Sequence, residues 1–523
     1  MRFDEMTTLR SLLLVVALTA KLQNISGARI LLMSPQLQSH VMRQTATGEE
    51  LVRRGHEVYV AIAATHRNPE ALEQLGLRTV RYRVPPSEVR NLPHWSKYLQ
   101  SLAFSPDYDA YTFAQSISAK VSMQCEFMMS DNKFMERVRV LKLDIAVVEP
   151  FHVNPCVLLL PYSLNLRFVS MSNYYLPWSI RMTALPSFLA SRDPINVPTG
   201  SESVLWDTVI YIRALGRATF RLWNSTLLQH HSSKGLTWTE LILKSELFLI
   251  ISDHHLGSPL PTFPNTIPVP CVTVRPTKPL PDELEKLAMQ SRDGIILATF
   301  GSMTSSFPDP VVVKFLEAFS RVRQTVFAKM HIPEAVTVPR NVHVFQWLPQ
   351  NDILAHQRTK LFITHCGNNG QHEALYHAVP MLGFPLFGDQ PTNCERARAK
   401  GFGLKMNIHD FTSDELFDNI REILDNATYG DNIRRRSAIL RDQPLVGPNK
   451  SAHWIEHVIK HGSAHLRSPA MDLPLHRFLM LDVIAVVFVM TFVAITIACL
   501  STVVITRTIC TKWMYQPNDK KAQ

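Results

Sequence analysis

The 29 residues from Phe362 to Gln390 constrain the fold of this chain more than any other stretch. They read FITHCGNNGQHEALYHAVPMLGFPLFGDQ: a strand-like start, a Gly-rich turn, a helix-like centre and a second apolar run that ends in Asp389-Gln390. Strand, turn, helix and strand in this order predict a parallel α/β sheet. Ligands of such sheets bind at the carboxyl ends of the strands, where the polar residues of this stretch lie.

The N-terminal part shows the same rhythm. We predict a strand over 28–34, a helix over 41–54 closed by Gly55, and a strand over 57–63, which together make a βαβ unit. Residues 143–148 and 166–171 are predicted as later strands of the same sheet. Residues 176–243 show no clear alternation and are expected to cap a pocket.

A Pro-rich segment marks the predicted domain boundary. Residues 259–281 contain eight prolines in 23 positions, a composition that excludes a helix or a central strand. After it the α/β rhythm restarts, with strands expected at 294–300, 325–330, 342–345, 361–364 and 379–386. We therefore predict two Rossmann-like doubly wound domains, 29–258 and 282–465, joined by this linker and facing a cleft.

Length and composition suit a globular chain. The 523 residues are 46% apolar and 19% charged, enough to bury sizeable cores. The net charge of +10 comes from scattered Lys and Arg, and no nucleic-acid-reading motif accompanies it, so no nucleic-acid partner is predicted.

Both ends carry targeting signals. Residues 1–28 resemble a signal peptide, with the apolar run 12–20 and small residues at 26–28. Residues 483–506 contain no charge and would span about 36 Å as a helix, enough for a single-pass membrane anchor; a buried core helix is the less favoured alternative. The basic tail 507–523 is expected in the cytosol, which places the preceding domains in the lumen. Lys520 and Lys521 resemble a dilysine endoplasmic-reticulum retrieval signal.

Other features of the sequence agree with a lumenal body. Sequons occur at Asn24, Asn224, Asn426 and Asn449, each a candidate glycosylation site. Five cysteines precede the apolar run, namely Cys125, Cys156, Cys271, Cys366 and Cys394. Their spacing indicates neither a disulfide scaffold nor a zinc site, so no metal is predicted.

The turn after the predicted strand 361–364 is suited to an anion. His365 ends the strand, and Gly367, Asn369 and Gly370 lead into a helix whose free N–H groups favour a phosphate. Glu373, one turn along that helix, could bind ribose hydroxyls. Asp389 and Gln390, after the next strand, could bind a second sugar, although a lone acidic residue here would more often be a surface charge.

Two further strand ends carry suitable groups. Trp347 and Gln350 follow one strand and offer an indole face and an amide to a flat base. Ser302 follows another strand in the turn Gly301-Ser302-Met303. Together these sites predict a receptor for a nucleotide diphosphate sugar.

The segment HCGNNGQHEALYHAVPMLGFPLFGDQ resembles the signature of the UDP-glucuronosyltransferase family, the animal UDP-glycosyltransferases of GT-B fold. The resemblance extends to RGHEV, FGSM, WLPQNDILAH, WIEHVIKHGSAHLR and the terminal apolar span, and so to nearly the whole chain. By this resemblance Trp347 and Gln350 contact uracil, Glu373 the ribose, Ser302, His365 and Asn369 the diphosphate, and Asp389 and Gln390 the transferred sugar.

The resemblance also implies a catalytic pair. His40 follows the first strand and would be the base that deprotonates an acceptor hydroxyl. Family members mostly place Asp where this chain has Glu149; we retain Glu149 as the partner that orients His40, with Asp144 as the fallback.

The expected reaction is an inverting transfer of a glucuronosyl or glucosyl group from UDP-glucuronic acid or UDP-glucose to a hydroxyl of a small lipophilic acceptor, without another cofactor. The replacement of Asp by Glu149 leaves one alternative, a catalytically inactive membrane-tethered UDP-sugar-binding protein. The sequence chooses neither the donor nor the acceptor, and it leaves homo-oligomerisation open.

Overall fold

A computed structural model describes residues 27–66, 68–105, 110–150, 154–173, 225–231, 235–252, 256–257, 262–301, 306–478 and 480–515. The chain divides into two compact units, Met1–Leu466 and Arg467–Gln523. The predicted signal peptide, most of the predicted pocket cap and the dilysine pair lie outside the described residues.

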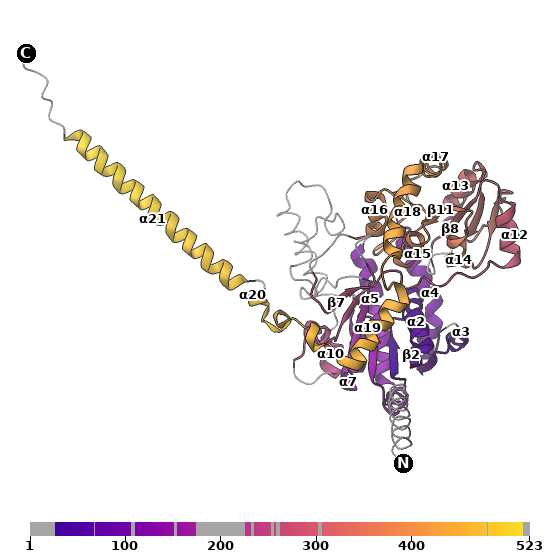
Figure 1. Ribbon diagram of the computed structural model, residues 1–523, viewed down its shortest axis with the longest axis horizontal. Coiled ribbons are helices and arrows are strands. Elements are labelled where there is room, and N and C mark those ends of the chain that lie inside the picture. Colours follow the sequence, from indigo (N-terminus) through magenta and orange to yellow (C-terminus); the bar gives the residue numbers. More distant parts are fainter. Residues whose placement is uncertain are drawn as a thin grey trace, which may run out of the picture. The chain divides into compact units, whose positions relative to one another are not determined.

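The first unit contains two parallel sheets; in Figure 1, β2 and β7 mark the first and β8 and β11 the second. The first sheet has the order β3-β2-β1-β4-β5-β6-β7. Its strands are β1 (Arg29–Met33), β2 (Glu57–Ala63), β3 (Arg78–Tyr82), β4 (Ile145–Val148), β5 (Phe168–Ser172), β6 (Phe248–Ile250) and β7 (Thr266–Pro268). The helices of this lobe are α2 (Gln38–Arg53), α3 (Pro69–Gln74), α4 (Pro86–Ala103), α5 (Ala110–Ser130), α6 (Asn132–Val140), α7 (Leu159–Ser163), α10 (Ser225–His231) and α11 (Trp238–Ile242), with a 3-10 turn at Cys156–Leu158.

The second sheet has the order β10-β9-β8-β11-β12-β13. Its strands are β8 (Ile295–Thr299), β9 (Thr325–Lys329), β10 (Val342–Val344), β11 (Thr359–Thr364), β12 (Met381–Gly383) and β13 (Gly403–Lys405). The helices that follow are α12 (Asp282–Gln290), α13 (Asp309–Ser320), α14 (Gln350–Ala355), α15 (Asn368–Tyr376), α16 (Gln390–Ala399), α17 (Ser413–Asp425), α18 (Ala427–Arg441) and α19 (Gly447–His461), then a 3-10 turn at Ala464–Leu466. Both sheets reverse strand order beside their first strand, as in doubly wound folds.

The predicted strands of the first lobe are confirmed, within one or two residues at their ends. Every residue from Val58 to Ala63 is buried, which is why β2 reads as a continuous apolar run. Gly55, just after α2, has a φ of +93°, a left-handed conformation that favours glycine at a helix end.

The Pro-rich stretch contains one strand. β7 (Thr266–Pro268) pairs in parallel with β6 and forms an edge of the first sheet. Proline is tolerated at an edge because no neighbour needs its missing N–H. The domain boundary proposed from the sequence therefore crosses a segment that belongs partly to the first sheet.

Helix α19 returns to the first lobe. Its buried residues Ala452, Ile455 and Val458 join the core around β1, β2 and β4. Thr47 Oγ1 of α2 and Ser451 Oγ of α19 lie 2.8 Å apart in this interface. The residue range proposed for the second domain thus includes a helix that packs on the first sheet.

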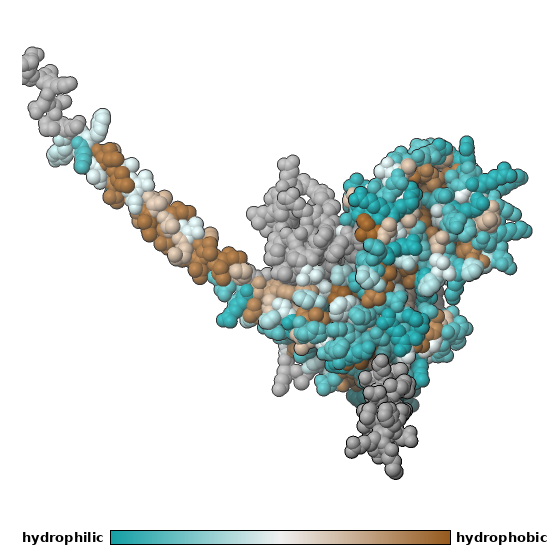
Figure 2. Space-filling model, viewed as in Figure 1, coloured by the Kyte–Doolittle hydropathy of each residue, from teal (hydrophilic) through white to brown (hydrophobic). Residues whose placement is uncertain are grey.

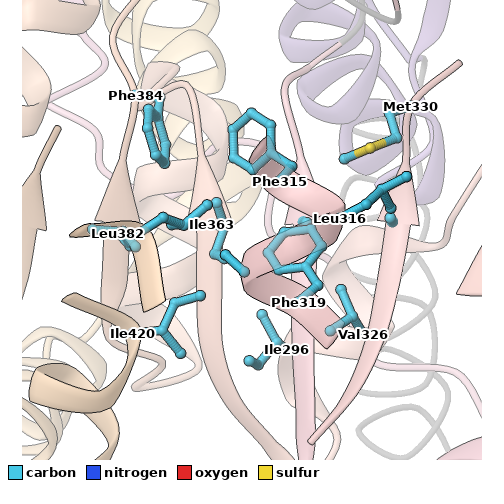
Figure 3. Packing of buried hydrophobic residues seen from close by; sticks show 14 of the residues in the cluster. Ile296, Phe315, Leu316, Phe319, Val326, Met330, Ile363, Leu382, Phe384 and Ile420 are labelled. Atoms are coloured by element: carbon cyan, nitrogen blue, oxygen red, sulfur yellow. The ribbon is translucent and has the colours of Figure 1, made fainter. Parts of the chain in front are cut away.

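The second sheet has a core on each face. One contains a group of aromatic rings, shown in Figure 3 with Phe315 and Phe319 of α13 and Phe384, which follows β12. Phe315 and Phe384 meet edge to face with ring centroids 5.1 Å apart. This packing holds β8 and β11 in place beneath the site.

The second unit contains a 3-10 turn (Pro469–Asp472), α20 (Leu475–Phe478) and α21 (Leu481–Met514). α21 has 34 residues and contains an 18-residue window with a mean hydropathy of 2.9, and it alone among the described helices is long and apolar enough to cross a membrane. Its surface is mostly brown in Figure 2. Its threonines donate to carbonyls within the helix, for example Thr491 to Val487 at 2.8 Å, so they need no water there.

Two disulfides correct the cysteine prediction. Cys125 pairs with Cys156 and Cys366 pairs with Cys394. The partners are 31 and 28 residues apart in sequence. Spacing alone did not indicate them because the fold brings distant segments together.

Candidate active site

The predicted base and its partner meet where the first sheet reverses its strand order. β1 and β4 are neighbours, with Met33 opposite Val148, so residues that follow the two strands emerge side by side. His40 lies in the first turn of α2, and Glu149 follows β4 directly. His40 Nδ1 and Glu149 Oε1 are 2.7 Å apart. The longer Glu side chain therefore reaches the position expected of a shorter Asp.

Asp144 has a different role. Its Oδ2 accepts a hydrogen bond from the backbone N–H of Arg29 at 2.7 Å, at the opposite end of β4. This contact ties two strand starts together and leaves Glu149 as the carboxylate beside His40.

The sequence reading missed Arg43. This residue is 2% exposed, and its Nη2 donates to Glu149 Oε1 at 2.6 Å. Its Nη1 donates to Asn173 Oδ1, just after β5. Its position could have been predicted from helical spacing. Residues i and i+3 share one face of a helix, so Arg43 lies beside His40.

His365 lies between two glycines at the strand reversal of the second sheet. It follows β11, whose neighbour β8 ends just before Gly301. A Cβ at Gly301 or at Gly367 would lie 2.6 Å from His365 Nε2, closer than two such atoms can approach. Gly301 also has a φ of +81°. The glycines are therefore required by the position of the ring.

The His365 ring is neutral at physiological pH. Its packed surroundings withdraw it from water and lower its pKa to about 4, with Asp389 opposing and Lys329 reinforcing the shift. Lys329 ends β9 and donates to the carbonyl of Gly301 at 3.1 Å. Burial lowers the pKa of Lys329 as well. This lysine was missed, although a basic residue at the end of a buried strand is an available signal.

Helix α15 presents its N-terminus at this turn. Gly367 is the N-cap residue, and Asn369 and Gly370 lie in the first turn. Asn369 Oδ1 is buried and has no hydrogen-bond partner among the described residues. Free N–H groups and an unpaired buried oxygen mark a position where a polar ligand can bind.

Gln350 and Glu373 form a buried pair. Gln350 Nε2 donates to Glu373 Oε2 at 2.6 Å, and Gln350 Oε1 accepts from Thr299 Oγ1 at 2.6 Å. Burial raises the pKa of Glu373 to about 7, although the Gln350 hydrogen bond lowers it. Trp347, shortly before Gln350, is 70% exposed, so its indole face is accessible to a planar ring.

Asp389 and Gln390 begin helix α16. Asp389 Oδ2 accepts from Asn393 Nδ2 at 2.8 Å, which directs this carboxylate. Gln390 Oε1 accepts from the backbone N–H groups of Leu386 and Phe387 at 2.8 and 3.1 Å. Only the Gln390 NH₂ group is then left to donate to a ligand.

The two sites are adjacent. Asn369 Nδ2 donates to the carbonyl of Ser39, the residue before His40, at 3.2 Å. Asn368 Nδ2 donates to Asn173 Oδ1 at 3.2 Å and to the carbonyl of Ile251 at 3.0 Å. Asn368, given no role from the sequence, therefore joins the turn of the second lobe to strand ends of the first.

Several predicted residues are not part of this geometry. Ser302, Asn24 and Asn224 lie outside the described residues. Asn426 is exposed at the N-cap of α18, and Asn449 is exposed at the start of α19. Asn449 Oδ1 accepts from Arg54 Nη2 at 3.0 Å.

Two facing doubly wound lobes with an anion-binding turn define the class of nucleotide-sugar glycosyltransferases. Solved glycosyltransferases share this architecture. The spinosyn forosaminyltransferase SpnP matches with a TM-score of 0.57 and 18% identity, covering 83% of this chain and 100% of that one. The glycosyltransferase of kitacinnamycin gives a TM-score of 0.56 at 18% identity, covering 83% and 99%.

Sequence relatives narrow the class. The UDP-glucuronosyltransferase 2C1 of Oryctolagus cuniculus is 31% identical over 478 residues, 87% of this chain and 93% of that protein. The UDP-glucuronosyltransferase 2B17 of Homo sapiens is 28% identical over 524 residues, 96% of each. The family model "UDP-glucoronosyl and UDP-glucosyl transferase" matches residues 29–515.

The chain belongs to the UDP-glucuronosyl and UDP-glucosyl transferase family and is a UDP-sugar-dependent hexosyltransferase of GT-B fold. These matches give no support to the alternative of an inactive binding protein.

Proposed function

We propose that this enzyme transfers a hexosyl group to a hydroxyl of a small lipophilic acceptor, with inversion, and that His40 is the base. The 2.7 Å contact between His40 Nδ1 and Glu149 Oε1 carries the proposal. A carboxylate at this distance accepts the Nδ1–H and leaves the Nε2 lone pair free to take a proton. It also stabilises the imidazolium that forms.

The second lobe binds the donor in this proposal. Trp347 stacks on uracil, and Gln350 bonds to its edge. Glu373 accepts from the ribose hydroxyls. The N–H groups of α15, with Ser302, His365 and Asn369, bind the diphosphate. Asp389 and Gln390 bind the hydroxyls of the transferred sugar. Lys329 adds a positive charge near the phosphates.

The reaction is a single displacement at the anomeric carbon. The acceptor proton moves to His40 Nε2 while the acceptor oxygen bonds to the anomeric carbon. The bond from that carbon to the phosphate oxygen breaks, and UDP leaves with the electron pair. A neutral His365 contributes an N–H hydrogen bond to the departing diphosphate, and the N-terminus of α15 contributes its dipole.

The donor is UDP-glucuronic acid in our proposal, with UDP-glucose as the alternative. The two sequence relatives described above carry the name UDP-glucuronosyltransferase. We further propose that α21 anchors the enzyme in the endoplasmic reticulum, with the lobes in the lumen and the basic tail in the cytosol. The apolar length of α21 supports the anchor, and the tail lysines support the orientation.

Mass spectrometry of the products tests the proposal. Microsomes that contain the enzyme receive equal amounts of both UDP-sugars and a panel of phenols, and the mass added to the phenol identifies the donor. His40→Ala should reduce transfer by about 10²- to 10⁴-fold while UDP binding is retained. A His40→Ala enzyme with normal turnover would show that another group is the base. Failure of the wild-type enzyme to glycosylate any acceptor would refute the transferase assignment.

A further inference from the structure

Arg43 is a buried cation whose bonds all lie within the catalytic region. It is 2% exposed, and burying a guanidinium is costly unless its donors find acceptors. Its terminal nitrogens bond to Glu149 and Asn173, while its Nε has no partner among the described residues. For the stability of the fold alone, a hydrophobic side chain of similar size would serve as well as or better than a buried arginine.

Arg43 and His40 both contact the same carboxylate oxygen of Glu149. Glu149 Oε1 lies 2.7 Å from His40 Nδ1 and 2.6 Å from Arg43 Nη2. Arg43 Nη2 also lies 2.6 Å from His40 Nδ1. Because arginine has donors and no acceptor, that last contact is a hydrogen bond only when Nδ1 is unprotonated. In that tautomer Nε2 carries the proton and cannot act as a base.

Glu149 decides between the two tautomers. With its carboxylate present, both donors point at Oε1 and His40 Nε2 carries no proton. Without the Glu149 carboxylate, Arg43 would donate to His40 Nδ1. It would then favour the tautomer in which Nε2 carries the proton and cannot act as a base. Arg43 also limits the extra torsion of Glu compared with Asp, because a second bond holds the carboxylate in place.

Asn173 extends this arrangement to the other lobe. Its Oδ1 accepts from Arg43 and, at 3.2 Å, from Asn368 Nδ2 in the first turn of α15. Asn368 is followed by Asn369, which donates to the carbonyl before His40. The side chains of Arg43 and Asn173 therefore connect Glu149 to the first turn of α15.

We propose that Arg43 is a positioning residue that holds Glu149 against His40 and, through Asn173, fixes this pair relative to the donor turn at Asn368. This role rests on the proposed function of His40. Arg43 is 2% exposed and bonds to Glu149 and Asn173, so in this role it acts on the rate of transfer and not on donor binding.

Kinetics of Arg43→Met and Arg43→Lys, with UDP-glucuronic acid or UDP-glucose and 1-naphthol, test the role. We expect kcat of Arg43→Met to fall on the order of 10²-fold while the KM for the donor changes less than about threefold. Lys carries a compact charge and lacks the planar fork of a guanidinium that holds two acceptors in fixed positions, so Arg43→Lys should lower kcat on the order of tenfold.

Arg54→Met is the matched control. Arg54 directly follows α2, and it bonds to Glu50 at 2.7 Å and to Glu456 at 2.9 Å, away from His40. This variant also removes a partly buried, ion-paired arginine, so a general loss of stability would appear in both. Its kcat per UDP-binding site should stay within about twofold of the wild type.

A double variant covers the case in which Arg43→Met does not fold. Glu149→Leu leaves Arg43 free to donate to His40, whereas Arg43→Met/Glu149→Leu removes both charges and the competing donor. Per UDP-binding site, the double variant should turn over about tenfold faster than Glu149→Leu. A double variant no faster than Glu149→Leu, or an Arg43→Met enzyme with wild-type kcat, would refute the positioning role alone. A wild-type enzyme that transfers no sugar would refute both this role and the proposed function.

Discussion

Gln350 donates a hydrogen bond to Glu373 at 2.6 Å inside the second lobe, across the strand ends that would contact a nucleoside. The pair joins α14 to α15. Burial of the ionised Glu373 carboxylate destabilises the enzyme without ligand. The stability of the enzyme therefore depends on pH through this residue.

Glu373→Gln should stabilise the enzyme at pH 8 and weaken donor binding. The pKa of Glu373 is raised from 4.5 to about 7, so the native state favours the protonated form by ~3 kcal/mol. Its stabilising contribution is present below the unfolded pKa and is lost as the pH rises through 7. Thermal scans should show a higher Tm for the variant at pH 8 and nearly equal values at pH 4.

Donor kinetics give the second measurement of the same variant. An amide cannot replace a carboxylate that accepts from two ribose hydroxyls, so KM for the donor should rise about tenfold. An equal Tm difference at both pH values would show that folding does not raise the pKa of Glu373. An unchanged KM would show that the ribose lies elsewhere.

Gly301→Ala should reduce transfer more than its backbone strain alone explains. The new Cβ would lie 2.6 Å from His365 Nε2, and the φ of +81° adds a cost of ~1–2 kcal/mol. Gly55→Ala is the control, because Gly55 has a φ of +93° with nothing within 4 Å of the added Cβ. Gly301→Ala should lose at least as much stability as Gly55→Ala, whereas only Gly301→Ala should lower kcat/KM, on the order of tenfold. Equal kcat/KM values for the two variants would show that the position of His365 does not affect the transfer reaction.

Periodicity and strand ends carried most of what could be predicted. The continuous apolar run at 57–63 allowed one strand to be placed, and the family resemblance, together with the positions of His40 and Glu149 after two strands, suggested that they form a pair. Doubly wound topology makes residues that follow neighbouring strands lie side by side.

The remaining features depend on contacts between distant segments. Cys125 and Cys156 pair because η1, at Cys156–Leu158, packs against α5, which no spacing rule encodes. The contacts of Arg43 depend on β5 and β4 ending beside α2. Helix α19 has an apolar face that would suit either sheet, and only tertiary packing assigns it to the first.

Lys329→Met should weaken donor binding more than it affects turnover. Lys329 lies at the end of β9 and is held near the diphosphate turn by its bond to the carbonyl of Gly301. Loss of one partly desolvated charge should raise KM for the UDP-sugar by about tenfold, more at low than at high salt. Lys405→Met is the control, because Lys405 also ends a strand of this sheet but is exposed at the edge strand β13. A KM independent of Lys329 would place the phosphates away from β9.

The disulfide Cys366–Cys394 should matter for donor binding as well as for stability. It ties the residue after His365 to α16, and Asn393 Nδ2 donates to the carbonyl of Cys366 at 3.0 Å in the same connection. Removing either disulfide should cost ~3–4 kcal/mol, because they enclose loops of similar length, with separations of 28 and 31.

The two double-serine variants therefore form a matched pair. Cys366→Ser/Cys394→Ser should raise the KM for the UDP-sugar about fivefold, because the diphosphate turn and the residues at the start of α16 are no longer held together. Cys125→Ser/Cys156→Ser should lower Tm comparably and leave this KM unchanged. Thermal scans and donor kinetics on both variants separate the two effects. A KM that rises equally in both would mean that the Cys366–Cys394 bond acts through overall stability and not by holding the donor site.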